Sequence, residues 1–306
     1  MTMRCVFTID VEDWFHILDL SSTPNISEWD ALPSHLERNF LRLLDILSET
    51  NTRATCFFLG WVAERFPDLV REAVQRGHEV ASHGYSHRLV YGMTPGEFLE
   101  DVTHAKKVIE DASGQQVLGY RAPGFSVTEE TPWFFDRLME AGYRYDSSVF
   151  PGPRGHGGLR NGRCAPYRLG PADEFVEFPV SVERIAGRPV CFFGGGYLRL
   201  FPYSLVKSMT RRVLSQDRPV IFYVHPREID PGQPRLAMSL ARRVKSYINL
   251  SSTEGKIRKL CTDFEMAPFQ DILAMEMQRH SAKVGNREVM QIAAAGQVKE
   301  SGAARV

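Results

Sequence analysis

Short apolar runs alternate with amphipathic runs along the first half of the chain, and this alternation limits the possible folds more than any other feature. The apolar runs predict buried strands at residues 5–9, 54–59, 79–81, 117–120 and 143–145. Helices are expected between them: one from about Ser34, one ending near Gly77, one capped by Thr94 and one over 129–141. This rhythm predicts an α/β fold with parallel strands, either a barrel or a doubly wound sheet.

Two of these helices begin with a capping-box pattern, in which a hydroxyl residue is followed three positions later by glutamate. Ser34 and Glu37 form one pair, and Thr94 and Glu97 form the other. We therefore expect these side chains to satisfy the free backbone N–H groups at both helix starts.

The second half of the chain breaks the alternation. Residues 151–163 hold five glycines, two prolines and three arginines, a composition typical of a functional or mobile loop. We expect the arginines (Arg154, Arg160 and Arg163) to be solvated, with a sugar phosphate or acidic polymer as their alternative partner. Later segments predict a two-stranded β insertion at 175–182 and 190–193, a strand at 219–224, and helices at 203–215 and 234–247. We assign residues 1–278 to one domain, with an insertion over 150–217, and expect a flexible tail at 279–306.

Composition excludes several classes of protein. Lys+Arg and Asp+Glu both total 37, so there is no overall basic field to bind nucleic acid. The five cysteines are odd in number and lack CxxC spacing, which disfavours a disulfide framework or a zinc ribbon. No apolar stretch approaches the roughly 20 residues of a membrane span, and the N-terminus lacks a signal-peptide pattern. We expect a cytoplasmic protein without a transmembrane segment.

Polar residues that could perform catalysis follow the predicted strands, where the ligand face of an α/β fold lies. An acid cluster of Asp10, Glu12 and Asp13 follows the first strand, and the HxxxH pair His83 and His87 follows the third. On a helical turn, two imidazoles four residues apart point the same way. With one carboxylate they form a ligand set that catalytic zinc uses, leaving one position open for water.

Three further residues end strands in the same manner. Arg121, in Arg121-Ala-Pro-Gly-Phe125, could hold a carboxylate by two hydrogen bonds, and Asp146 and His225 follow two other strands. Taken singly, each could be structural: a solvated acid, a surface turn, or a histidine bonded to a backbone carbonyl. Their succession, each after a strand, favours one catalytic site.

In this order the motifs resemble those of the carbohydrate esterase family 4 polysaccharide deacetylases, the NodB-homology domain, over residues 4–150 and 218–228. The segments Asp10-Val-Glu-Asp-Trp-Phe-His16 and His225-Pro-Arg-Glu-Ile-Asp230 are similar to the branch associated with exopolysaccharide gene clusters. The resemblance implies a distorted (β/α) barrel of about seven strands, here with a β-rich insertion. It also implies metal-dependent removal of N-acetyl groups from a glycan that contains N-acetylhexosamine.

The resemblance further implies a role for each catalytic residue. Asp10 would be the general base and His225 the general acid. Arg121 would orient Asp10, and Asp146 would tune the pKa of His225.

Metal and substrate contacts follow from the same resemblance. His83 and His87 would bind a divalent metal, zinc first, with cobalt, nickel or iron as alternatives. Phe125 would line the acetyl pocket, and a backbone N–H of the turn at Gly124 and Phe125 would stabilise the oxyanion. Trp14, directly after the acid cluster, would line the cleft.

The third metal ligand is either Glu12 or Asp13, because Val11 separates the two acids that stand side by side in the usual family pattern. Residues two apart in a strand share a face, which favours Glu12 as the partner of Asp10. Asp13 is the alternative if the strand ends at Val11 and the chain turns.

Two other functions remain open. One is hydrolysis of another C–N bond, in a formyl-sugar or a cyclic amide. The other is a catalytically silent glycan-binding module, against which the complete set of acid, base and ligand residues argues.

Overall fold

A computed structural model describes residues 5–18, 20, 22–171 and 173–279. The chain divides into two compact units, 1–269 and 270–306. The described residues of the second unit, 270–279, are helical. Apart from Arg279, the expected flexible tail lies outside the described residues, and the domain boundary at residue 278 stays a prediction.

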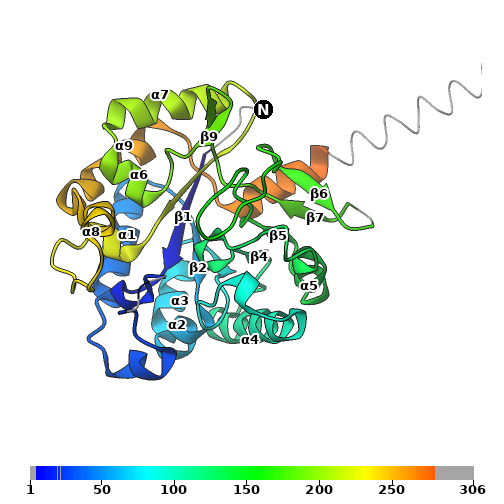
Figure 1. Ribbon diagram of the computed structural model, residues 1–306, viewed down its shortest axis with the longest axis horizontal. Helices are drawn as coiled ribbons and strands as arrows, with labels where there is room; N and C mark the ends of the chain where they lie inside the picture. Colours follow the sequence, from blue (N-terminus) through cyan, green and yellow to red (C-terminus); the bar gives the residue numbers. More distant parts are fainter. Residues whose placement is uncertain (1–4, 19, 21, 172, 280–306) are drawn as a thin grey trace, which may run out of the picture. The chain divides into compact units, whose positions relative to one another are not determined.

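One large curled sheet organises the first unit (Figure 1). The strands are β1 (Cys5–Val11), β2 (Thr55–Phe58), β3 (Glu79–Ser82), β4 (Gly119–Tyr120), β5 (Tyr145–Asp146), β6 (Tyr167–Leu169), β7 (Phe175–Glu177), β8 (Glu183–Ile185), β9 (Arg188–Val190) and β10 (Val220–Val224). Within the described residues, eight of them form one sheet in the order β10-β1-β2-β3-β4-β5-β7-β6. Neighbours from β10 to β7 are parallel, and only the edge strand β6 is antiparallel. This architecture confirms the predicted distorted barrel of about seven strands.

Helices occupy the connections that the alternation predicts. They are α1 (Leu36–Glu49), α2 (Gly60–Arg65), α3 (Pro67–Gln75), α4 (Pro95–Ser113), α5 (Phe134–Glu140), α6 (Gly195–Leu200), α7 (Tyr203–Leu214), α8 (Leu240–Tyr247) and α9 (Thr253–Asp263). Six short 3₁₀ turns accompany them in the described residues: η1 (Trp14–His16), η2 (Ile26–Ala31), η3 (Val90–Gly92), η4 (Pro123–Phe125), η5 (Pro226–Ile229) and η6 (Leu250–Ser252). Among the residues that the structure describes, no helix is long and apolar enough to span a bilayer.

The two predicted capping boxes have different outcomes. Thr94 caps α4 and forms the full box with Glu97, as expected. At α1 the box of Ser34 and Glu37 does not form, because His35 is the N-cap residue and Ser34 turns its hydroxyl toward Asp13. The Asp13 carboxylate shares the capping with Ser34: it accepts hydrogen bonds from the backbone N–H groups of His35 (3.0 Å) and Leu36 (3.3 Å), and the Ser34 hydroxyl also accepts from the Leu36 N–H (3.2 Å).

The β insertion differs from its prediction. Phe175–Glu177 does not pair with residues 190–193; it continues the main sheet beside β5, and β6 closes that edge. The small hairpin is formed by β8 and β9. The helix predicted at 234–247 starts only at Leu240. A buried strand of three residues has too few positions to reveal a period of two, so the sequence pattern missed its partner.

Strand β1 sets the position of the site. All seven of its residues are buried, as expected of a parallel strand covered on both faces. Ile9 pairs with Val224 of β10, so the residues that follow them, Asp10 and His225, leave neighbouring strands at the same edge.

Candidate active site and metal centre

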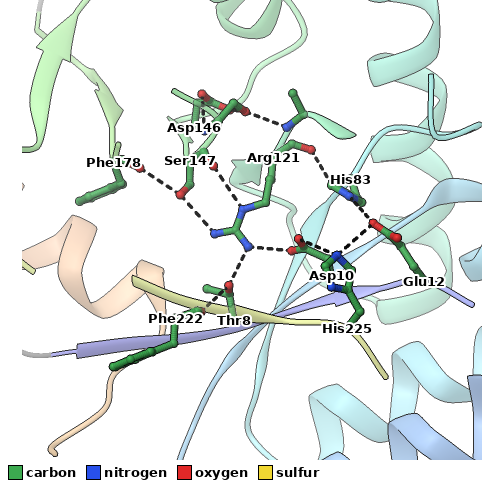
Figure 2. Close-up of polar contacts among 12 residues, drawn as sticks. Thr8, Asp10, Glu12, His83, Arg121, Asp146, Ser147, Phe178, Phe222 and His225 are labelled. Carbon is green, nitrogen blue, oxygen red and sulfur yellow. Dashed lines mark hydrogen bonds and ion pairs between the residues drawn. The ribbon is translucent and has the colours of Figure 1, made fainter. Parts of the chain in front are cut away.

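Side chains from four strand ends meet at the carboxyl edge of the sheet. Figure 2 shows acids from β1 facing histidines and an arginine that leave other strands. The structure brings together six of the residues predicted from the sequence: Asp10, Glu12, His83, His87, Arg121 and His225.

Glu12, His83 and His87 form a buried cluster with the composition of a metal centre. Oε1 of Glu12 lies 3.0 Å from Nε2 of His83 and 2.9 Å from Nε2 of His87. Nδ1 of His83 lies 2.7 Å from the backbone carbonyl of Arg121, which can only accept, so Nδ1 carries a proton. Nε2 faces Glu12: in a charged ring it donates to the carboxylate, and in a neutral ring it presents a lone pair that a metal could take. Lone pairs and a carboxylate that converge in this way fit a divalent cation.

The charge state of Glu12 suits this role. Burial opposes its ionisation, but the charges of His87 and His225 and the hydrogen bonds from the two histidines outweigh burial and hold the pKa of Glu12 well below its usual range. His16, on the other side of His87, has its pKa lowered by burial and by neighbouring cations, and is therefore neutral near pH 7. The cluster thus concentrates one buried anion among imidazoles.

The HxxxH segment reaches this arrangement without a helical turn, contrary to the expectation. Residues 83–87 are irregular, with positive φ at Gly84 (76°) and His87 (55°). Asp101 of α4 fixes the loop by accepting hydrogen bonds from the Tyr85 N–H (2.9 Å) and the Ser86 hydroxyl (3.1 Å). A Cβ at position 84 would lie 2.9 Å from that carboxylate, so glycine is required there.

Asp13 lies outside the cluster. β1 does end at Val11, the condition under which Asp13 was the alternative ligand, but the chain then enters η1 with Asp13 as its N-cap. The carboxylate accepts from the Trp14 N–H (2.7 Å), the Ser34 hydroxyl (2.6 Å) and the start of α1. Its oxygens are therefore occupied by helix caps, whereas Glu12 faces both histidines.

Arg121 holds Asp10 as the resemblance implied. The guanidinium is fully buried and donates to Oδ1 of Asp10 (2.7 Å), to the Thr8 hydroxyl (2.6 Å) and to Ser147. It also lies 4.1 Å above the ring of Phe57. These contacts fix the Asp10 carboxylate beside the candidate metal centre. Asp10, Glu12 and His225 form a second group whose possible ligand atoms lie within 4.8 Å of one another.

His225 lies on the opposite side of the acids and has a partner that the sequence prediction missed. Its Nε2 is 3.8 Å from Asp10 and 3.7 Å from Glu12, and its Nδ1 is 3.6 Å from Oε2 of Glu228. Arg199 donates to the other oxygen of Glu228 (3.3 Å). Burial lowers the pKa of His225, but the Glu12 charge and the Glu228 contact outweigh it and raise that pKa above its ordinary value. Glu228 stands three residues after His225, with Pro226 between them, which is a capping-box spacing that could have revealed it.

Asp146 does not contact His225. Its carboxylate accepts hydrogen bonds from the hydroxyl (2.5 Å) and the backbone N–H (3.0 Å) of Ser148, and it pairs with Glu177 of β7. Burial, more than any other cause, raises the pKa of Asp146 to about 6 and that of Glu177 well above its usual range. The raised pKa values favour a hydrogen bond between the two buried carboxyls, and Glu12 and Glu228, not Asp146, are the groups that raise the pKa of His225.

Two of the three predicted substrate residues line the cavity, and the third does not. Gly124 and Phe125, both with positive φ, line the cavity in front of the metal cluster. The Phe125 N–H already donates to the Ala122 carbonyl (3.0 Å), which leaves the Gly124 N–H as the donor that this turn could offer. Trp14 does not line the cavity: it is buried, packs edge-on against Phe15, and donates its indole N–H to the Pro33 carbonyl. Its prediction as a cleft residue is corrected, and His16 and Leu18 occupy that wall.

The cavity has a volume of about 780 Å³ and extends from the acid and histidine cluster to α6 and α8. One wall comes from the first half of the chain, and the other comes from residues after 150. The second half thus supplies both the candidate acid and most of the outer wall.

Two sequence families match successive parts of this chain. Residues 26–145 match the polysaccharide deacetylase family, and residues 147–274 match a domain of unknown function, DUF3473. The chain is 28% identical over 142 residues to a peptidoglycan deacetylase of Helicobacter pylori, covering 46% of this chain and 44% of the relative. It is 28% identical over 88 residues to a peptidoglycan-N-acetylglucosamine deacetylase of Bacillus cereus, covering 29% of this chain and 32% of that relative. The chain thus spans less than half the length of these curated relatives.

A solved structure extends the likeness in fold beyond these segments. A Mycobacterium smegmatis protein provisionally described as a polysaccharide deacetylase superposes with a TM-score of 0.60 at 21% identity, covering 91% of this chain and 92% of the other. The family match over residues 26–145 and the curated relatives thus make this chain similar to polysaccharide deacetylases, while the solved structure shows a likeness of fold.

Proposed function

We propose that the chain hydrolyses N-acetyl groups on the amino sugars of a polysaccharide or its precursor, with a divalent metal at Glu12, His83 and His87. The observation that carries the proposal is the convergence of two imidazole nitrogens on one buried carboxylate oxygen, within 3.0 Å, beside a second carboxylate and a third histidine. The chemistry that a divalent metal supplies at such a site is polarisation of the acetyl carbonyl and activation of water. Two nitrogens and one oxygen suit zinc, with cobalt, nickel or iron as alternatives.

Two residues of the chain carry out the two proton transfers. Asp10, held by Arg121, accepts the proton of the attacking water at its carboxylate. His225 donates a proton to the leaving amine, and the raised pKa of its imidazole keeps the acid form available near neutral pH. The Gly124 N–H stabilises the developing oxyanion.

The family matches favour this reaction over hydrolysis of a formyl-sugar or a cyclic amide. A silent glycan-binding module has no need of a candidate base and acid beside a metal cluster. Membership of the exopolysaccharide branch rests on the segments at residues 10–16 and 225–230 and stays a prediction.

The test combines metal analysis with a substrate screen. Purified protein should contain about one divalent metal per chain and release acetate from acetylated chitooligosaccharides. The screen reads acetate, formate and ammonia in parallel. Formate or ammonia in place of acetate would select the alternative reaction, and a chain without any turnover on metal loading would select the binding module.

A further inference from the structure

The outer part of the cavity, beyond the metal cluster, is strongly cationic. Arg227 lines it from η5, and Arg242 and Lys245 line it from α8. Arg154 lines it from the glycine-rich loop. Since the whole chain has no net charge, this concentration is a local property of the cavity.

The carboxylates that line the cavity each have another group as hydrogen-bond partner. Asp10 is bound by Arg121, Glu12 by two imidazoles, and Glu228 by Arg199. Among the described residues, no carboxylate lies within ion-pair distance of Arg154, Arg227, Arg242 or Lys245. Burial, and after it the positive charges of Arg154 and Arg242, lower the pKa of Lys245.

Arg154 is held in place although it has no anionic partner. Its guanidinium lies 5.0 Å from the ring of Phe125 and 5.3 Å from that of Phe150. Its Nη1 is buried and has no hydrogen-bond partner within the described residues. A planar guanidinium that packs against two aromatic rings and has a buried nitrogen without an acceptor is suited to binding carboxylate or phosphate oxygens.

We propose that the cavity binds a glycan bearing an anionic oxygen group, a carboxylate or a phosphate, next to the acetylated sugar, with Arg154 and Lys245 as its principal contacts. The inference rests on the proposed hydrolysis at the same cavity and names the class of substrate. Candidate sources of the anion are a uronic acid in the chain or a sugar phosphate at its end. The neutral glycan lacks the group that these cations would bind.

The test is calorimetric titration of the full chain with three probes: chitotetraose, which is neutral, a hyaluronan tetrasaccharide, which carries carboxylates, and N-acetylglucosamine 1-phosphate. At least one anionic probe should bind more tightly than chitotetraose, and only anionic binding should weaken from about 50 to about 300 mM NaCl. Arg154→Gln and Lys245→Gln should each weaken that probe about five-fold more than they weaken chitotetraose. Arg160→Gln, in the same loop, and Arg243→Gln, on α8, are matched controls, because neither side chain lines the cavity.

Equal binding of neutral and anionic probes, loss of affinity in the controls equal to that in the cavity variants, or no binding of any probe up to about 10 mM would overturn the inference. Which anionic probe binds identifies the source of the charge. Acetate release is measured on the same samples. Selective anionic binding without acetate release would refute the proposed hydrolysis and leave the anion site standing, whereas acetate release without anion preference would do the reverse.

Discussion

Two pairs of buried carboxyl groups stand at the same edge of the sheet, yet they have opposite electrostatic character. Asp10 and Glu12 leave the end of β1, and Asp146 and Glu177 lie on β5 and β7. All four are at most 3% exposed. The pKa of Glu12 is held well below its usual range, whereas those of Asp146 and Glu177 are raised.

Burial opposes the ionisation of Glu12, Asp146 and Glu177 alike, and the neighbouring groups decide whether that effect is overcome. Glu12 faces imidazoles that favour its charged form, so the first pair is prepared to hold a cation. In the second pair each carboxyl faces the other. Two buried negative charges repel each other, so protonation of one carboxyl is favoured. The second pair has a structural use: Asp146 accepts from the Ser148 hydroxyl, which in turn accepts from the Ala122 N–H (2.7 Å) before the η4 turn.

The largest effect is expected from variants that remove a ligand of the proposed metal site. Glu12→Gln removes the charge at which both histidines converge, and His83→Ala removes a ligand. Each should weaken metal binding by more than about 100-fold, because loss of mere supporting contacts already costs 10- to 100-fold. Metal analysis after dialysis and titration with zinc measure this. Full metal occupancy in His83→Ala would refute the assigned centre.

Asp10→Asn should distinguish the role of Asp10 from that of Glu12. The amide still accepts from Arg121 but is a poor base, so the variant should keep its metal and lose about 10²- to 10⁴-fold in kcat. Acetate release and metal content are measured on one preparation. If this variant loses the metal, Asp10 is a ligand, as its proximity to Glu12 and His225 would also allow, and the division of roles is wrong.

Glu177→Gln tests the second pair through stability. The folded pKa of Asp146 is about 6, and both folded values lie above those of an unfolded chain, near 4. The protons are therefore bound more tightly in the folded state, and their stabilising contribution is complete below the unfolded pKa and is lost as pH rises through the folded value. Glutamine cannot ionise and can donate to Asp146. Its variant should lose less stability between about pH 5 and pH 8, by a few degrees in Tm.

Thermal unfolding at both pH values is the measurement, and Glu130→Gln, on an exposed side chain without a side-chain hydrogen bond, is the control. A parallel pH dependence in wild type and Glu177→Gln would mean that the pair does not hold its proton in the folded state.

The sequence predicted what depends on strand ends and periodicity. The parallel sheet follows from apolar runs, and Asp10, His83, Arg121 and His225 meet because each leaves the same edge. Contacts made across long stretches of chain were not predictable in this way. The partnership of Asp146 with Glu177 depends on a three-residue strand in the insertion, and the exclusion of Trp14 from the cavity depends on the distant Pro33 carbonyl.

The choice between Glu12 and Asp13 shows the same limit. Local spacing favoured Glu12 by strand alternation, whereas the structure separates the two acids by what lies 21 to 23 residues further on, the start of α1. A serine followed by glutamate at capping-box spacing gave no sign that the cap would come from elsewhere. Only the folded chain shows that one acid of the cluster serves a helix and another faces the histidines.

The smallest effect is expected from Asp13→Asn, which tests whether Asp13 acts as a helix cap and not as a metal ligand. The carboxylate accepts from the Trp14, His35 and Leu36 N–H groups and from Ser34, while burial raises its pKa despite these bonds. The amide keeps one acceptor and loses the charge that favours two N-termini, so the free energy of unfolding should fall by about 0.5–2 kcal/mol. Urea unfolding measures this, and Ser34→Ala in a double-mutant cycle isolates the side-chain contact. Metal affinity should stay at the wild-type value, because the Asp13 oxygens face α1. A variant with normal stability and weakened metal binding would make Asp13 the ligand and Glu12 its neighbour.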